Sequence, residues 1–374
     1  MARLGDICTR ITDGSHNPPQ GISHSEYLML SSKNIYDDEI TLDDPRFLSA
    51  ENYETENKRT QISTGDILLT IVGTVGRAAV VPNSIKNICL QRSVAVIKPK
   101  SDLVDSRFLM YQLQSMRTQL EQEARGVAQK GIYLKQVENL QIKVPSLDEQ
   151  LRVVKKLDKV SKLIALRKEQ LTKLDQLVKS RFIELFGDRY INDKKWDNKP
   201  LYECADFCNG KAHEQVVDEN GEYILVTSRC IASDISDYRR TNALLFPLQV
   251  NDIAMVMSDV PNGRALAKCV LIDEDGKYTL NQRICCLRNY SFNPIFFYYL
   301  LNRHEYFLSF NDGNAQTNLR KDDLLACNII IPPMEVQEQF ATFVEQTDKS
   351  KLAVQQSIAE LEELKKSLMQ KYFG

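Results

Sequence analysis

The feature that most constrains the fold is a long helical stretch that occurs twice in the chain. Residues 148–186 contain no proline and no glycine and are rich in Leu, Lys, Glu and Gln, which favour helix. Apolar residues recur in steps of three and four, with polar residues in the gaps. So narrow an apolar stripe is typical of a coiled-coil seam and requires a partner helix. Gly187 provides a glycine stop.

The predicted partner helix is the end of the same chain. A shift of 187 positions overlays Pro145 on Pro332, Gln150 on Gln337 and Phe186 on Phe373. Residues 148–186 hold ten Lys and Arg against six Asp and Glu, whereas 335–373 hold five against seven. This difference in charge favours pairing of the two helices over pairing of either with itself. The predicted contact residues are Leu157, Ile164, Leu171, Leu174, Val178 and Leu185 in the first helix and Val354, Ile358, Leu361, Leu368 and Tyr372 in the second.

The regions that precede the helices also repeat. Residues 64–81 and 250–270 each predict a strand, a glycine-containing turn and a second strand. A Gln-Arg pair follows in both repeats. A helix is predicted next, with Asp105 as its N-cap in the first repeat and Asn293 in the second. We predict an α+β fold, with two globular α/β domains separated by two long antiparallel coiled-coil helices in a pseudo-twofold tandem repeat. The predicted segments are domain 1 (1–147), the central helix (148–188), domain 2 (189–334) and the distal helix (335–374).

Composition indicates the class of protein more than its function. The chain has 374 residues, a formal net charge of −2 and 26% charged residues, which is ordinary for a globular protein of two or three domains. Near-neutral charge argues against indiscriminate binding to nucleic acid but permits a local basic face. Nine cysteines without metal-site spacing indicate a reducing cytoplasm, and no apolar run is long enough for a membrane span.

The sequence offers no catalytic or metal site. Asn17-Pro18-Pro19-Gln20 is similar to the Asn-Pro-Pro-aromatic motif of amino-methyltransferases, but Gln20 replaces the aromatic residue that stacks on a flipped base. No glycine-rich nucleotide loop or phosphate loop is present. The four histidines show neither metal-ligand spacing nor a nucleophile partner. We therefore predict no catalytic residue and no metal ligand.

Polar loops are the remaining functional candidates. In a DNA major groove, Arg and Lys contact guanine, while Asn and Gln contact adenine. Solvated turns explain any single residue equally well, but two such domains joined by paired helices favour DNA binding. The candidates are Ser15, His16, Asn17, Lys33, Asn34, Thr74, Arg77, Gln129, Lys130, Lys211, His213, Ser228, Arg229, Asn262, Arg264, Asn314, Gln316 and Asn318.

Several short motifs occur in the same order in the first half, and most recur in the second. They are Leu4-Gly5-Asp6, Asp13 to His16, Gly65-Asp66, Gly73 to Gly76, Gln91-Arg92, Gly126 to Gln129, Glu149-Gln150 and Phe186-Gly187. Over its whole length the chain resembles the specificity (S) subunit of type I restriction–modification systems, the HsdS family. The second half departs at the glycine turn, where 257–263 read Met-Ser-Asp-Val-Pro-Asn-Gly.

The resemblance implies a non-catalytic subunit in a bacterial or archaeal cytoplasm. Each domain would recognise one half of a split double-stranded DNA target in the major groove. The helices would set the spacer and dock two modification subunits, which carry S-adenosylmethionine and methylate adenine. Restriction subunits would join for cleavage that depends on ATP and Mg²⁺. This chain would bind no cofactor and contact no membrane.

Two other classes of protein remain as alternatives. An enzyme with a fused methyltransferase is disfavoured by the missing cofactor loop and catalytic tetrapeptide. A protein–protein scaffold without a DNA function would be consistent with the long helices alone. Binding to random DNA duplexes, followed by sequence selection, separates a scaffold from a DNA-recognition subunit.

Overall fold

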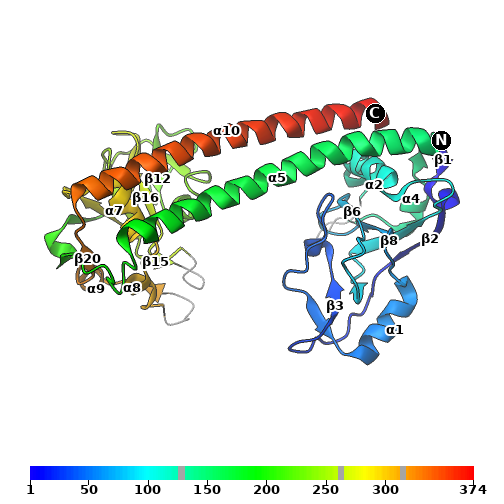
Figure 1. Ribbon diagram of the computed structural model, residues 1–374, viewed down its shortest axis with the longest axis horizontal. Helices are drawn as coiled ribbons and strands as arrows, with labels where there is room; N and C mark the ends of the chain where they lie inside the picture. The colour runs from blue at the N-terminus through cyan, green and yellow to red at the C-terminus, as the bar shows by residue number, and fades with distance from the viewer. Residues whose placement is uncertain (125–130, 260–264, 312–316) are drawn as a thin grey trace. The chain divides into compact units, whose positions relative to one another are not determined.

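The chain folds into two compact units. The computed structural model describes residues 1–124, 131–259, 265–311 and 317–374. Unit 1 comprises Met1–Glu169 and Gln355–Gly374, and unit 2 comprises Gln170–Val354. The long helices α5 (Leu147–Phe186) and α10 (Met334–Phe373) contribute residues to both units (Figure 1). Each unit therefore contains a globular part and one segment of each long helix.

Within residues 1–124 and 131–146, unit 1 contains short strands and four helices in addition to its segments of α5 and α10. Its strands are β1 (Ala2–Arg3), β2 (Cys8–Asp13), β3 (Tyr27–Leu30), β4 (Arg46–Leu48), β5 (Ile67–Thr70), β6 (Ala78–Val80), β7 (Ile88–Leu90), β8 (Val94–Pro99) and β9 (Gln141–Ile142). Its helices are α1 (Ala50–Thr60), α2 (Ser106–Ser115), α3 (Arg117–Glu123) and α4 (Leu134–Glu138), with 3-10 turns η1 (Leu4–Ile7) and η2 (Ser32–Asn34).

The main sheet of unit 1 lies between two apolar cores. Its four strands are antiparallel in the order β2-β8-β5-β6. Successive side chains of a strand face opposite sides of a sheet. Ile67 and Leu69 of β5 accordingly enter the core that includes α2 and α5, whereas Leu68 enters a second core with Leu30 and Leu90. Burial on both faces explains why the central strand β5 is a continuous apolar run.

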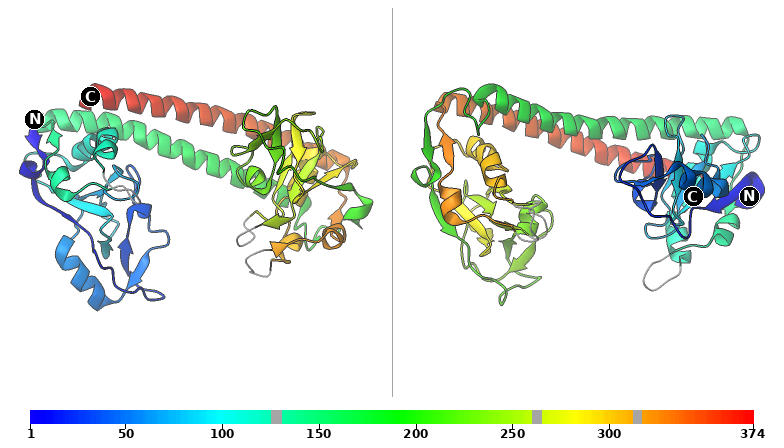
Figure 2. Two further views of the ribbon diagram at one scale, coloured as in Figure 1. Left: turned by 180° about the vertical axis from the view of Figure 1, so that it is seen from behind. Right: turned by 90° about the horizontal axis from the view of Figure 1, so that it is seen from below.

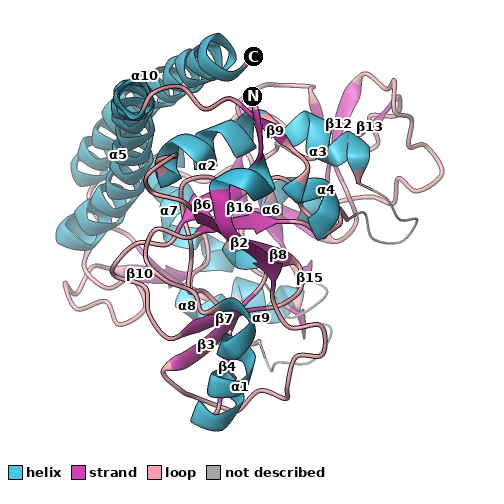
Figure 3. Ribbon diagram, turned by 90° about the vertical axis from the view of Figure 1, so that its right-hand side faces the viewer, coloured by secondary structure: helices cyan, strands magenta, loops and turns pink. Residues whose placement is uncertain are grey.

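The second sheet of unit 1 brings three loops toward one edge. Its order is β4-β3-β7, and β3 and β7 run parallel with Leu30 opposite Leu90. Parallel strands end at the same edge of a sheet, so the residues after Leu30 and after Leu90 become neighbours. Helix α1, capped by Ser49, packs on β3 and β7 (Figure 3).

Unit 2 contains a corresponding set of elements. Its strands are β10 (Asn198–Pro200), β11 (Asp206–Asn209), β12 (Tyr223–Val226), β13 (Arg239–Thr241), β14 (Ile253–Val256), β15 (Ser258–Asp259), β16 (Cys269–Leu271), β17 (Tyr278–Leu280), β18 (Ile284–Arg288), β19 (Thr317–Asn318) and β20 (Asn328–Ile330). Its helices are α6 (Ser228–Ala232), α7 (Pro294–Leu301), α8 (Glu305–Leu308) and α9 (Lys321–Leu325), with the 3-10 turn η3 (Leu201–Glu203).

The strand order of unit 2 repeats that of unit 1. The main sheet has the order β11-β18-β14-β16, and the second sheet β13-β12-β17 again contains one parallel pair, β12 with β17. The small pair β10-β20 corresponds to β1-β9, while β15-β19 has no counterpart among the described strands of unit 1. The predicted α+β tandem repeat is therefore confirmed.

A buried aspartate performs the same task in both repeats. Asp66, in the Gly-Asp motif before β5, accepts a hydrogen bond from Ser63 N at 2.8 Å and forms an ion pair with Lys98. Asp252, before β14, forms the equivalent ion pair with Arg288. Both carboxylates are almost fully buried, so each needs its cationic partner.

The long helices pair antiparallel within each unit. In unit 1, Lys156 Nζ lies 3.1 Å from the Tyr372 hydroxyl, and Lys168 pairs with Glu362 at 3.3 Å. In unit 2, Lys351 pairs with Asp175 at 2.7 Å. Residue numbers rise along α5 as they fall along α10, and both views of Figure 2 show the helices side by side within each unit. The antiparallel pairing that the sequence predicts is thus observed.

The helices also complete the domain cores. Leu157 and Phe373 belong to the main core of unit 1, and Phe182, Phe186 and Phe340 belong to that of unit 2. The Phe182 and Phe340 rings meet edge to face at 5.4 Å. All residues predicted for the helix pair are buried or half-buried, namely Leu157, Ile164, Leu171, Leu174, Val178, Leu185, Val354, Ile358, Leu361, Leu368 and Tyr372.

Candidate nucleic-acid interface

The loops that follow β2, β3 and β7 meet at one edge of unit 1. Ser15 N donates a hydrogen bond to Leu90 O at 2.7 Å, and Arg92 N donates to Ser15 O at 2.9 Å. Gln91 N donates to Leu30 O at 2.9 Å. Backbone bonds therefore hold three loops, distant in sequence, in one surface. Ser15 itself is only 7% exposed, so its contribution is chiefly this backbone pairing.

The close approach of these loops depends on a glycine. A Cβ atom at Gly14 would lie 2.1 Å from Leu90 O, closer than any real Cβ contact. A larger residue would push the loop after β2 away from β7.

Two adjoining hollows, of about 270 and 510 Å³, lie over this surface. Both are lined by His16, Val72 and Arg92. The smaller is also lined by Ser15, Pro18, Ser31, Ser32, Gln91 and Ser93, and the larger by Asp13, Arg59, Ile71 and residues 131–134. We refer to this part of unit 1 as the loop cluster.

An ion-pair network secures the start of the loop cluster. Arg59, in the last turn of α1, donates through Nε to Asp13 O at 3.0 Å and pairs with the Asp13 carboxylate. The other oxygen of that carboxylate, Oδ2, lies 2.8 Å from His16 Nε2. Asp13 is buried, whereas the His16 side chain is 52% exposed. The network therefore holds His16 at the surface.

Among the other described candidates of unit 1, Asn17, Lys33 and Thr74 are exposed and Arg77 is half-buried. Asn17 and Thr74 face solvent. Lys33 is exposed and pairs with Asp44 at 2.5 Å, and the half-buried Arg77 places its guanidinium 4.9 Å from the centre of the Tyr36 ring.

Two candidates must be withdrawn because they lie in the interior. Asn34 donates to Asp43 O at 2.8 Å and accepts from Ser31 N at 3.1 Å. The ring nitrogens of His213 lie 2.7 Å from a backbone carbonyl oxygen and 2.9 Å from Thr279 Oγ1. Asn34 is 1% exposed and His213 is 0% exposed. Both side chains satisfy hydrogen bonds within the fold and cannot reach a base.

Unit 2 reproduces the loop geometry with other side chains. Lys211 N donates to Leu280 O at 2.9 Å, as Ser15 does to Leu90. A Cβ atom at Gly210 would lie 2.2 Å from Asn281 O, so this glycine has the role of Gly14. The Lys211 side chain is exposed at this position.

The other described candidates of unit 2 lie on α6 and β19. Ser228 begins α6 and is half-buried, and the next residue, Arg229, pairs with Asp237 at 2.5 Å. Asn318 is exposed and lies opposite Ser258 in the β15-β19 pair. The candidates Gln129, Lys130, Asn262, Arg264, Asn314 and Gln316 lie outside the described residues.

The structure corrects the alignment of the repeated Gln-Arg pair. Gln91 pairs with Ser15, and the residue that pairs with Lys211 in the same way is Asn281, not Gln282. The parallel pairs β3-β7 and β12-β17 fix this register. Arg92 is therefore equivalent to Gln282 and not to Arg283, with which the two Gln-Arg pairs would align it. Arg92, Gln282 and Arg283 lie in turns, and Gln91 forms an isolated bridge with Ser15.

Two arginines of the loop cluster, Arg59 and Arg92, are not among the sequence candidates. Arg59 gave no local signal, because α1 approaches Asp13 only through tertiary packing. Arg92 did give a sequence signal. A charged arginine between two buried strands is excluded from the apolar core and must lie at a sheet edge. Its exposure agrees with that reasoning.

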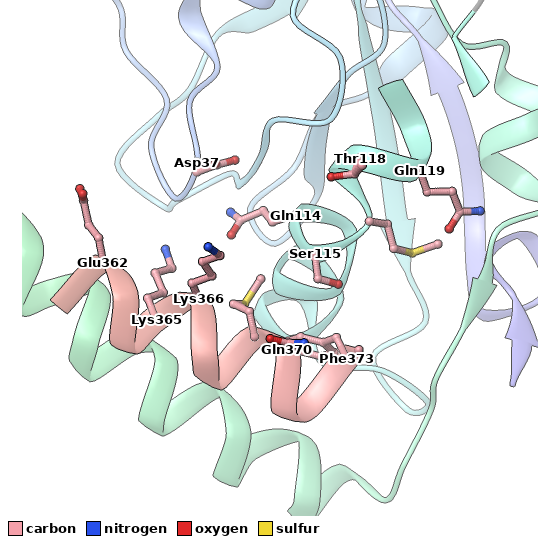
Figure 4. Close-up of a pocket in the computed structure, with 13 residues that line it drawn as sticks. Asp37, Gln114, Ser115, Thr118, Gln119, Glu362, Lys365, Lys366, Gln370 and Phe373 are labelled. Atoms are coloured by element: carbon pink, nitrogen blue, oxygen red, sulfur yellow. The ribbon is translucent and has the colours of Figure 1, made fainter. Parts of the chain in front are cut away.

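A larger groove of unit 1 lies elsewhere, between α2, α3 and the end of α10 (Figure 4). Its volume is about 750 Å³. Lys365 at its wall pairs with Asp38 at 2.5 Å, and Arg117 pairs with Asp37 at 2.6 Å. Gln114 donates to Asp38 Oδ1 at 3.1 Å. The Lys365–Asp38 pair joins α10 to the globular part of unit 1, whereas the other two contacts lie within that part. None of the described DNA-contact candidates lines this groove.

The described parts of the chain contain neither a metal-binding cluster nor a membrane-spanning helix. There, no three His, Cys, Asp or Glu side chains are arranged to hold a metal ion. No helix in the same residues is both long and apolar enough to cross a bilayer.

The fold defines a protein with two copies of one α+β domain, each followed by a long helix. A family model described as the type I restriction modification DNA specificity domain matches residues 3–176 and 193–363. The two matches cover most of the chain, one in each repeat. The chain belongs to this family.

Two curated relatives are specificity subunits. That of the type I restriction enzyme EcoBI from Escherichia coli is 35% identical over 128 residues, which cover 34% of this chain and 27% of the relative. That of the enzyme MjaVIII from Methanocaldococcus jannaschii is 23% identical over 341 residues, which cover 84% of this chain and 79% of the relative. The chain thus aligns with about a quarter of the first relative and with most of the second.

A solved structure shares the fold. It concerns the structural basis of complex assembly and conformational transition in the type I R-M system. Its TM-score is 0.60 at 17% identity, over 100% of this chain and 96% of the other.

Proposed function

We propose that this chain is the DNA-recognition subunit of a type I restriction–modification complex. In this proposal each unit recognises one half of a bipartite double-stranded target through the major groove. The observation that carries the proposal is the match of both repeats to the DNA specificity domain family. The loop cluster supports it, because His16 and Arg92 are exposed and line the same hollow, and arginine is a residue that contacts base edges in a major groove.

The two half-sites should differ in sequence. The repeats share strand order and the close glycine contact, yet Ser15 in one occupies the position of Lys211 in the other. A common scaffold with different side chains is what recognition of two unlike sequences requires.

The helix pair is proposed to set the spacer between half-sites and to dock two modification subunits. Large apolar side chains remain exposed on both helices, including Leu163 (39%) and Leu166 (49%) in unit 1 and Leu177 (49%) and Leu352 (57%) in unit 2. Exposed apolar residues on a rigid helix are typical of a surface that another protein covers.

The chemistry of the complex is assigned to its other subunits. Modification subunits would supply S-adenosylmethionine and methylate adenine, and restriction subunits would supply ATP- and Mg²⁺-dependent translocation and cleavage. The present chain would contribute recognition only, in the cytoplasm of a bacterium or archaeon.

Mapping of methylated adenine across the host genome, with and without this gene, tests the proposal. We expect one bipartite motif whose methylation disappears on deletion and returns on complementation. A protein scaffold without a DNA role would leave the methylation pattern unchanged, and that result would refute the proposal.

A further inference from the structure

The turn between β7 and β8 and the turn between β17 and β18 share one backbone and present different side chains. The sequence of residues 91–93 is Gln-Arg-Ser, and that of 281–283 is Asn-Gln-Arg. Val94 N donates to Gln91 O at 3.1 Å, and Ile284 N donates to Asn281 O at 3.1 Å. The two turns are therefore equivalent residue by residue.

Both turns are held rigidly. The residues on either side, Leu90 and Val94 in unit 1, are buried at 1% and 0% exposure, and their unit 2 equivalents are also buried. The carbonyl oxygen of Ser93 accepts a bond from Ile71 N at 2.9 Å. A rigid backbone positions an exposed side chain precisely enough to distinguish one base from another.

Arg92 is the central residue of the first turn. Its side chain is exposed and lines both hollows of the loop cluster beside His16. In the part of the chain that the structure describes, its guanidinium has no hydrogen-bond or ion-pair partner. An arginine with its donors available can form two hydrogen bonds to O6 and N7 of guanine.

Gln282 is the equivalent residue of the second turn. Its Nε2 donates to Glu214 Oε1 at 3.1 Å. This bond orients the amide and leaves one N–H and the carbonyl oxygen available. A donor and an acceptor side by side match N7 and the N6 amino group of adenine.

We infer that these two central residues determine specificity, with Arg92 contacting a guanine in one half-site and Gln282 contacting an adenine in the other. The inference rests on the proposed function and adds to it the residues that distinguish the half-sites. It follows from the shared turn geometry, because Arg92 and Gln282 occupy the same place in their units. Each residue should therefore contact the base pair at the same position of its own half-site.

The test is to map adenine methylation by the full complex carrying Arg92→Gln. We expect the guanine preference to fall by about tenfold or more at one position of one half-site, with a gain for adenine, while the other half-site stays unchanged. Gln282→Ala should relax an adenine position in the other half-site only.

Arg10→Gln is the matched control, because Arg10 is an exposed arginine of β2 in the same unit and its loss changes the net charge equally. Arg92→Lys should keep the guanine preference, since lysine also donates to guanine, and it serves as the test if Arg92→Gln fails to assemble. An unchanged half-site in Arg92→Gln, or weaker methylation of all sequences alike, would overturn the inference. Absence of any bipartite motif in the parent complex would instead overturn the proposed function.

Discussion

Gln150 Oε1 accepts a hydrogen bond from the backbone N–H of Asp105 at 2.8 Å, which joins the first turn of α5 to the residue that caps α2. Gln150 Nε2 donates to Leu103 O at 3.0 Å and to Pro145 O at 2.8 Å. The side chain is 0% exposed. A single glutamine thus fixes how the long helix leaves the globular part of unit 1.

Gln337 performs the same task in unit 2. Its Oε1 accepts from Asn293 N at 2.9 Å, and its Nε2 donates to Pro332 O at 2.8 Å. Asn293 caps α7 as Asp105 caps α2. Gln150 and Gln337, which overlay in the sequence, therefore make equivalent hydrogen bonds in the two units.

Replacement of Gln150 by Leu should destabilise unit 1 by about 2–4 kcal/mol, because buried N–H and C=O groups would lose their partners. Hydrogen–deuterium exchange in α2 and the first turns of α5 measures the effect. Gln337→Leu should instead weaken unit 2, where the single tryptophan, Trp196, reports unfolding by fluorescence. Equal loss in both units from either change would contradict these local roles.

Gly14→Ala should destabilise unit 1 by about 1–3 kcal/mol or more, because the new methyl group would meet Leu90 O. Gly5→Ala is the matched control, since a Cβ atom there would lie an ordinary 3.5 Å from Glu138 O. Denaturant unfolding followed by hydrogen exchange compares the two variants. Similar losses would show that the close contact is not what requires glycine.

His304 makes the stability of unit 2 depend on pH. The imidazole is 1% exposed, and its Nδ1 accepts a hydrogen bond from Tyr306 N at 3.1 Å. Burial, with help from the nearby Arg189 cation, lowers the pKa of His304 to about 4. In the unfolded chain this histidine titrates near the ordinary value of 6.5.

Between these two pKa values the unfolded state binds more protons than the folded state. The free energy of unfolding of unit 2 should therefore fall as the pH is lowered from about 6.5 to about 4, by up to about 3 kcal/mol. Trp196 fluorescence during urea unfolding at each pH gives the measurement. His304→Asn retains a side-chain oxygen that can cap α8, but it does not titrate. The free energy of unfolding of unit 2 should therefore change less in this variant than in the parent as the pH is lowered. An identical pH dependence would show that other groups are responsible.

Local patterns were sufficient to predict the long helices and the residues that cap α2 and α7. The absence of Gly and Pro, the spacing of Leu157 and Ile164, and the stop at Gly187 predicted α5 within a few residues. The mixed three-stranded sheets had no such signal. The parallel pairing of Leu30 with Leu90 joins segments sixty residues apart, and short strands of this kind leave no periodic pattern.

The loop cluster shows a similar division. The polar loop from Asp13 to Asn17 was predictable from composition, but burial of Asn34 was not, because a turn residue can bond to its own backbone as readily as to a ligand. The two Gln-Arg pairs suggest that Gln282 is equivalent to Gln91, whereas strand pairing makes Asn281 the equivalent residue. Strand pairing determines which residues are equivalent, and it cannot be seen in the sequence.

Arg59 anchors the loop cluster through Asp13, although it belongs to none of the sequence motifs. The Asp13 carboxylate is 9% exposed and the Arg59 side chain is 48% exposed, so the pair lies between a buried and a surface ion pair. Arg59→Gln should therefore destabilise unit 1 by only about 1–2 kcal/mol. It should also blur the sequence preference of one half-site, because the loop that carries His16 loses its anchor.

Lys58→Gln is the matched control for Arg59→Gln, as Lys58 is an exposed cation in the same turn of α1. Both variants remove one positive charge, so both lower non-specific attraction to DNA phosphates equally. Sequence selection with each complex separates loop positioning from charge. The positioning role requires that Arg59→Gln broadens the bases accepted in one half-site while Lys58→Gln keeps the parental motif. Equal broadening in both variants would show that Arg59 acts only through its charge.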